Sequence, residues 1–122
     1  MYKLNVISQF SAAHRLLGYQ GDCKNLHGHN WKVRVGIECG QLDELGLAID
    51  FGIIKKHLNK IMNKFDHQYL NDLEFFKEIN PSSENIARII FMEMSNSLDK
   101  PGCKIAEVEI WESDKTSLIY RD

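Results

Sequence analysis

The chain has 122 residues, of which 43% are hydrophobic and 26% are charged, and its formal net charge at pH 7 is −2. This length supports one domain with a core of its own, and the composition is ordinary for a globular protein. The near-neutral charge excludes the broad basic face of a nucleic-acid-binding protein, and no apolar run approaches the roughly 20 residues of a membrane span. We therefore expect a single domain over residues 1–122, with neither a nucleic-acid nor a membrane partner.

The thiols and the N-terminus indicate a compartment. Cys23, Cys39 and Cys103 are odd in number, and their spacing matches neither a zinc knuckle nor a disulfide framework. The first ten residues alternate polar and apolar side chains, unlike the apolar core of a signal peptide. These features predict reduced thiols in a cytoplasmic protein.

The first half of the chain predicts two strands and a helix. Apolar side chains at every second position predict a strand that starts near Tyr2, with His14 at its end, and a second, antiparallel strand over 30–39. An apolar stripe at helical spacing then predicts a helix from Phe51 to Phe65. The following segment, DHQYLND, breaks that pattern.

The second half predicts a helix and two further strands. The helix starts in NPSSE, where Asn80 or Ser82 can cap it. Alternation returns over 104–112, with Ala106 among the inward positions, and a last short strand covers 116–120. The order strand, strand, helix, helix, strand, strand predicts an α+β domain with two helices on one face of an antiparallel sheet. Its two open edges could pair with another copy of the chain.

Three histidines are the candidate metal ligands. His27 and His29 are two residues apart on an extended chain, so both rings can point to the same side. His14 can supply a third ring if the first two strands form a hairpin. Three imidazole nitrogens suit Zn²⁺ and leave its fourth position open to water or substrate. The alternative is that each histidine is a hydrogen-bonded structural residue.

Other titratable side chains could act beside a metal ion. Cys23 stands in a polar, glycine-flanked loop, where it is either a spare surface thiol or a thiolate that a nearby cation stabilises for use as a base. Asp66 could fix the tautomer of His67 in a proton-carrying pair; the alternative is that His67 only complements the dipole of a helix C-terminus. Glu112 extends an inward-facing row, so its carboxylate needs donors, which a ligand with adjacent N–H groups would supply; a frayed strand end is the alternative.

Taken together, the motifs resemble the family of 6-pyruvoyl-tetrahydropterin and 6-carboxytetrahydropterin synthases over nearly the whole chain, in the family's order: FSAAHRL, CKNLHGHNW, AIDF, DHQYLND, NPSSENIA and the WES–IYR ending. The resemblance implies the tunnelling fold, in which trimerisation closes a barrel and two trimers commonly stack as a hexamer. It also implies that His14, His27 and His29 are zinc ligands, that Cys23 is the catalytic thiol, and that Asp66 and His67 form a proton-relay pair. Glu112 would be the carboxylate that holds the pterin ring, and Ser82 and Ser83 would line the pterin pocket. From their charge and proximity, Arg15 and Lys24 could meet phosphate groups.

The same resemblance suggests the reaction. Three residues separate Cys23 from His27, as in the carboxytetrahydropterin synthases of queuosine biosynthesis, whereas the biopterin branch usually has a longer insert. We therefore expect a zinc enzyme that converts 7,8-dihydroneopterin triphosphate to 6-carboxytetrahydropterin, acetaldehyde and triphosphate. The alternatives are a 6-pyruvoyl-tetrahydropterin synthase and a non-catalytic, zinc-stabilised pterin-binding module.

Overall fold

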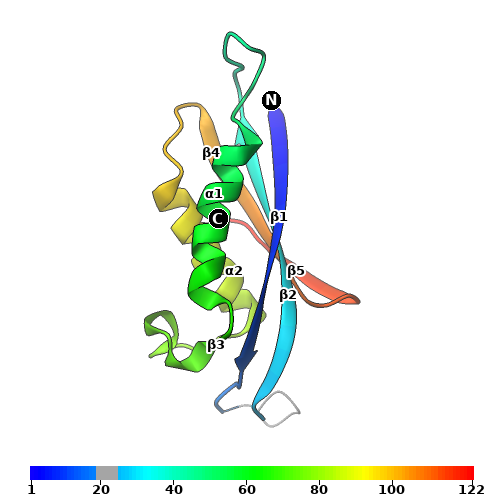
Figure 1. Ribbon diagram of the computed structural model, residues 1–122, viewed down its shortest axis with the longest axis vertical. Coiled ribbons are helices and arrows are strands. Elements are labelled where there is room, and N and C mark those ends of the chain that lie inside the picture. The colour runs from blue at the N-terminus through cyan, green and yellow to red at the C-terminus, as the bar shows by residue number, and fades with distance from the viewer. Residues whose placement is uncertain (19–24) are drawn as a thin grey trace.

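A computed structural model describes residues 1–18 and 25–122. It confirms the predicted α+β architecture: both helices lie on one face of a sheet whose strand order is β3-β1-β2-β4-β5 (Figure 1). The bounds are as follows: β1 (Tyr2–His14), β2 (His27–Cys39), α1 (Phe51–Phe65), β3 (Gln68–Tyr69), α2 (Ser83–Ser97), β4 (Cys103–Ser113) and β5 (Thr116–Tyr120). Among the described residues, no helix is both long and apolar enough to cross a bilayer.

The two longest strands form the centre of the domain. β1 and β2 pair antiparallel over their whole length, from Tyr2 opposite Cys39 to His14 opposite His27. β1 ends at His14, as predicted, whereas β2 begins three residues before the predicted range of 30–39 and so includes His27 and His29. The pairing at this end brings two of the three candidate ligands face to face.

The sheet has five strands, not the four predicted from the sequence. The additional strand, β3, comes from the segment that breaks the helical pattern, and it runs parallel to β1, with Gln68 opposite Ala12 and Tyr69 opposite Ala13. It is only two residues long, which is too short for a two-residue period to be visible in the sequence. Otherwise the sheet is antiparallel, as predicted.

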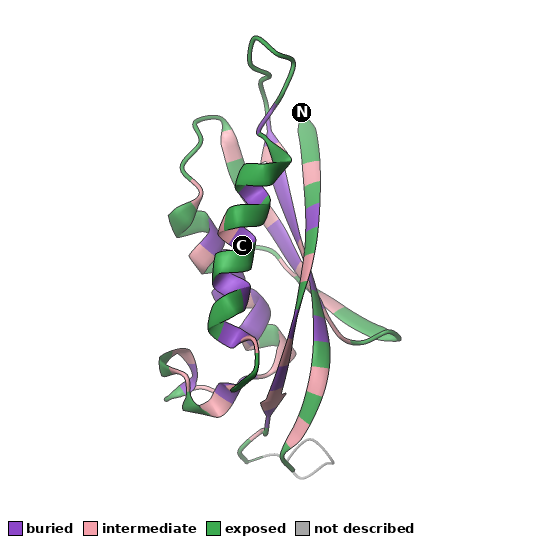
Figure 2. Ribbon diagram, viewed as in Figure 1, coloured by how far each residue is buried: buried purple, intermediate pink, exposed green. Residues whose placement is uncertain are grey.

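The core lies between the helices and the sheet, where the buried parts of both layers face each other (Figure 2). Asp50 caps α1 by accepting a hydrogen bond from the amide of Gly52, and Ser82 caps α2 by accepting from the amide of Asn85. One position differs from the prediction: a register shift beside Gly36 puts Ile105, not Ala106, in the core.

The other face of the sheet carries a charged cluster around Glu107. Although this carboxylate is only 5% exposed, it is paired with Lys3 Nζ at 2.8 Å, with Arg121 Nε at 3.0 Å and with the guanidinium of Arg34. Arg34 also contacts Glu109 at 3.0 Å. Hydrogen bonds from Lys3 and then Arg34 lower the pKa of Glu107 from 4.5 to about 2.

This lowered pKa predicts how stability depends on pH. Because the folded pKa lies below the unfolded value, Glu107 stabilises the fold above about pH 4.5, and its contribution is lost as the pH falls toward 2. Glu107→Gln should lower the free energy of unfolding by about 2 kcal/mol at pH 7. In urea denaturation, the difference in the free energy of unfolding between wild type and Glu107→Gln should be smaller at pH 4 than at pH 7, and smaller again at pH 3. The exposed Glu44→Gln control should unfold with the same free energy as wild type. An equal difference between wild type and Glu107→Gln at all pH values would contradict the assignment.

Cys39 and Cys103 form a disulfide, so the prediction of three reduced thiols was wrong for these two residues. They are direct register partners on β2 and β4, and Cys39 is completely buried. Their separation of 64 residues hides this pairing in the sequence, because it becomes visible only once the order and register of the strands are known.

The disulfide should stabilise the domain measurably. A cross-link that closes a loop of this length is worth about 4 kcal/mol in the chain-entropy model. We expect that a thiol reductant lowers the melting temperature of wild type and of Cys23→Ser, but not of a variant with both Cys39→Ser and Cys103→Ser. Alkylation of the unfolded, unreduced protein followed by mass spectrometry should leave both cysteines unmodified, and labelling of both would refute the cross-link.

Candidate metal centre

Three histidine rings converge at the end of the sheet where β1 runs beside β3, at the bottom of Figure 1. His14 is the last residue of β1 and lies directly opposite His27, the first of β2. His29 follows two residues later and so points to the same face of the sheet. One ligand atom from each ring and one carboxylate oxygen of Glu112 all lie within 4.8 Å of one another. The structure thus brings the three predicted metal ligands together.

Backbone carbonyls determine the tautomers of two of these rings. Nδ1 of His14 lies 2.7 Å from the carbonyl oxygen of Pro81, and Nδ1 of His27 lies 2.6 Å from that of Asn25. Because a carbonyl oxygen can only accept, each Nδ1 carries the hydrogen, and in a neutral ring Nε2 is left with a lone pair. The two Nε2 atoms are 2.9 Å apart. Two lone pairs at this distance repel unless a proton or a metal ion lies between them.

The third ring, that of His29, places another nitrogen atom beside these two. Nε2 of His29 is buried and finds no hydrogen-bond partner among the described residues: Oε1 of Glu112 is 2.8 Å away, but outside hydrogen-bonding geometry. Burial is the largest influence and lowers the pKa values of His14 and His29 despite the opposing effects of the Pro81 carbonyl on His14 and of Glu112 on His29, which keeps both rings neutral near pH 7. Neutral, unpaired imidazole nitrogens are the ligands of a divalent ion such as Zn²⁺. The donor set therefore fits the metal predicted from the sequence.

Glu112 lies closer to the histidines than the sequence suggested. Its Oε1 is 2.8, 3.6 and 3.9 Å from Nε2 of His29, His14 and His27, respectively. Its Oε2 accepts a hydrogen bond from Ser83 Oγ at 3.2 Å. The sequence predicted a carboxylate that holds a ligand ring, and the structure shows one that can also reach a metal ion.

Asp66 and His67 form a pair, but they lie outside the histidine group. Oδ1 of Asp66 is 3.0 Å from Nδ1 of His67 and also accepts a hydrogen bond from the amide of Ser11 at 2.8 Å. The amide of His67 donates to the carbonyl of Ser11 at 2.6 Å, and its imidazole is exposed. The pair is thus anchored on β1 three residues before His14, which is about 10 Å along a strand.

The two predicted pocket serines have different environments. Ser82 Oγ is used as the cap of α2, and Ser82 lines a hollow together with Leu16 and Asn85. Ser83 lines another hollow, of about 170 Å³, beside the metal centre; its walls are Ser83, Glu84, Ile110, Glu112, Thr116, Ser117 and Leu118. Glu84 in this hollow was not singled out from the sequence, where it looked like a residue of the first helical turn.

The remaining predicted residues are less constrained by the structure. Cys23 and Lys24 lie outside the described residues. Arg15 follows β1 and is exposed, and its backbone is held by Asn71, which accepts from its amide and donates to its carbonyl, each at 3.0 Å. The carbonyls of Pro81 and Asn25 were not predicted at all, since no side-chain pattern reveals a main-chain acceptor.

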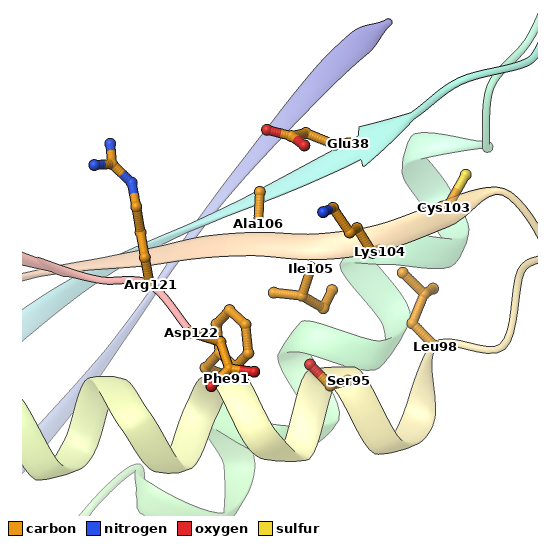
Figure 3. Close-up of a pocket in the computed structure, with 10 residues that line it drawn as sticks. All are labelled: Glu38, Phe91, Ser95, Leu98, Cys103, Lys104, Ile105, Ala106, Arg121 and Asp122. Carbon is orange, nitrogen blue, oxygen red and sulfur yellow. The ribbon is translucent and has the colours of Figure 1, made fainter.

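A roomier hollow of about 480 Å³ lies elsewhere, between α2 and β4 (Figure 3). Phe91 and Leu98 of its lining are apolar, whereas Lys104 and Arg121 are basic. It shares no residue with the histidine group and contains no comparable set of facing donor atoms. We therefore place the functional site at the histidines.

The protein should bind one Zn²⁺ per chain at this centre. Loss of a residue that only hydrogen-bonds to a metal ligand typically lowers metal affinity by roughly 10- to 100-fold. His27→Ala removes a ligand itself, so its zinc affinity should fall by more than that. His57→Ala, on α1, is the matched control and should bind zinc like wild type. Competition with a chromophoric chelator measures both affinities, and equal affinities for the two variants would exclude this centre.

Comparisons with known proteins agree with the fold and the site. The family model described as 6-pyruvoyl tetrahydropterin synthase matches residues 3–122. A Synechocystis protein named 6-carboxy-5,6,7,8-tetrahydropterin synthase is 38% identical over 116 residues, which cover 91% of this chain and 86% of that protein. A Bacillus subtilis protein of the same name is 30% identical, with 98% and 85% covered. The structure of Caenorhabditis elegans 6-pyruvoyl tetrahydropterin synthase superimposes with a TM-score of 0.89 at 30% identity, with 99% and 95% covered.

Proposed function

The chain belongs to the 6-pyruvoyl tetrahydropterin synthase family, and we propose that it is the zinc-dependent 6-carboxytetrahydropterin synthase of queuosine biosynthesis. Its substrate is then 7,8-dihydroneopterin triphosphate, and its products are 6-carboxytetrahydropterin, acetaldehyde and triphosphate. The observation that carries the proposal is the set of three imidazole nitrogens, two of them with the hydrogen fixed on the other ring nitrogen, that face one point beside a hollow. The names of the Synechocystis and Bacillus subtilis relatives support this branch of the family.

The histidine centre would hold and activate the substrate side chain. Bound there, Zn²⁺ would supply a positive charge that acidifies the side-chain hydroxyls of the substrate. His14 and His27 keep their Nε2 lone pairs available for that ion because Pro81 and Asn25 hold the hydrogen of each ring on Nδ1. The proximity of these three residues supports this part of the proposal.

The proton transfers would fall to Cys23, Asp66 and His67. We assign the Cys23 thiolate to removal of a proton from a carbon that bears a hydroxyl. Asp66 accepts from Nδ1 of His67, which leaves Nε2 of this exposed ring free to take or deliver a proton. Triphosphate would then leave, and cleavage of a carbon–carbon bond would shorten the side chain.

The ring would be held in the hollow beside the metal centre. Glu112 can accept hydrogen bonds from adjacent N–H groups of a pterin, as a bidentate carboxylate does. Ser83 holds that carboxylate by a hydrogen bond, and Ser82 caps the helix that carries Ser83. Orientation of the ring fixes which carbon of the side chain faces the base.

We also propose that the enzyme works as a homo-oligomer, a trimer or a pair of stacked trimers. β3 pairs with β1 only at Ala12 and Ala13, so most of that edge of β1 has no partner strand among the described residues. β5 forms the opposite edge of the sheet. Pairing between copies would cover both edges, which are otherwise open to aggregation.

A second candidate is the pyruvoyl branch, because the chain superimposes closely on the Caenorhabditis elegans 6-pyruvoyl tetrahydropterin synthase. The two activities differ in their products. Zinc-loaded protein incubated with 7,8-dihydroneopterin triphosphate should release acetaldehyde in step with triphosphate. Accumulation of 6-pyruvoyl-tetrahydropterin without acetaldehyde would instead assign the chain to the pyruvoyl branch.

Cys23→Ala separates an enzyme from a binding module. Loss of the base should reduce turnover by about 10²- to 10⁴-fold, while the zinc content stays unchanged because the three histidines remain. His57→Ala, remote from the centre, should keep full turnover. A wild-type protein that binds zinc and pterin but releases no product would be a binding module and would refute the proposed function.

A further inference from the structure

We propose that the carboxylate of Glu112 is the fourth ligand of the metal ion when no substrate is bound, and that an incoming ligand atom displaces it. This inference rests on the metal centre proposed above. It differs from the assignment of Glu112 to the pterin ring alone, because it gives the same side chain two successive partners.

The distances support coordination. In a tetrahedral site with bonds of about 2.0–2.1 Å, neighbouring ligand atoms lie about 3.3 Å apart. The separations of Glu112 Oε1 from the three imidazole nitrogens are 2.8, 3.6 and 3.9 Å, and the nitrogens of His14 and His27 are 2.9 Å apart. These values lie on both sides of the tetrahedral separation.

Local backbone geometry aims this side chain at the histidines. The register between β4 and β5 shifts between Trp111 and Ser113, so Glu112 sits in the irregularity itself. A β-bulge re-aims the side chain that it carries. In addition, Ser83 at the start of α2 holds Oε2, which leaves Oε1 to face the histidines as a single donor atom.

The same features make Glu112 the ligand best able to leave. His14 and His27 are each fixed by a carbonyl on the far side of the ring, and both lie on paired strands. Glu112 is held by one long hydrogen bond to Ser83 near the end of β4. It also lines the hollow of about 170 Å³ in which the ring would lie. A carboxylate displaced from the metal therefore needs no large movement to accept hydrogen bonds from a ligand in that hollow.

The first test is zinc affinity, measured by chelator competition without any substrate. Glu112→Gln keeps the shape of the side chain but weakens it as a metal ligand, so the zinc dissociation constant should rise at least about tenfold. Glu84→Gln makes the same change of charge in the wall of the same hollow, but outside the group of ligand atoms. It should change the zinc dissociation constant by less than about threefold. Equal changes of the zinc dissociation constant in the two variants would overturn the proposal, because the loss of a nearby negative charge would then explain both changes without coordination by Glu112.

The second test measures displacement directly. In Co²⁺-substituted protein, azide should bind at least about tenfold more tightly to Glu112→Gln than to wild type, because no carboxylate has to leave the metal first. The visible spectrum of the cobalt reports this binding, and Glu84→Gln should behave like wild type. Identical azide affinities in wild type and Glu112→Gln would overturn the proposal. If wild type bound neither Zn²⁺ nor Co²⁺, the metal centre itself and the proposed function would fail; if it bound both metals, only this inference would be at risk.

Discussion

The pairing register of β1 and β2 is the constraint on which both the core and the site depend. It places His14 opposite His27 at one end of the hairpin, and further along it places Phe10 opposite Trp31 in the core, with their rings stacked 5.8 Å apart. Side chains alternate strictly between the two faces of a strand, so a slip of β2 by one residue would turn its two histidines to the charged face. The same slip would expose Trp31, which is completely buried. Hydrophobic burial thus specifies the register, and the register assembles the metal centre.

The candidate metal centre is a point of electrostatic repulsion between imidazole nitrogens, which the rest of the fold holds close together. Three imidazole nitrogens lie close together, and the Nε2 atoms of His14 and His27 repel each other unless a proton or a metal ion lies between them, because carbonyls hold both rings in place. A divalent ion removes this repulsion, so its binding should be coupled to the stability of the hairpin end. Such preorganisation is useful for function because the ligands are already aimed before the ion arrives.

The sequence predicted the parts of the structure that depend on local periodicity, and it missed those that depend on contacts between distant segments. The helix from Phe51 to Phe65 followed from a repeat of 3.6 residues, and the common direction of His27 and His29 followed from a repeat of two; His14 could be added only on the condition that the first two strands form a hairpin. The disulfide did not follow from such a repeat, because it requires the register of β2 against β4. The position of Glu112 was also out of reach, since a register shift in β4 and a hydrogen bond from α2 determine where its carboxylate points.

Three consecutive residues at the start of α2 connect these elements. Pro81 fixes the ring of His14 through its carbonyl, Ser82 caps the helix, and Ser83 holds the carboxylate of Glu112. One short segment therefore orients groups from two strands that are not neighbours in the sheet. Because its own position is set by the cap and by the buried face of α2, helix packing and site geometry are coupled here. The residues that shape the site are thus not only those that could hold a metal ion, but also the turn that holds two of them in place.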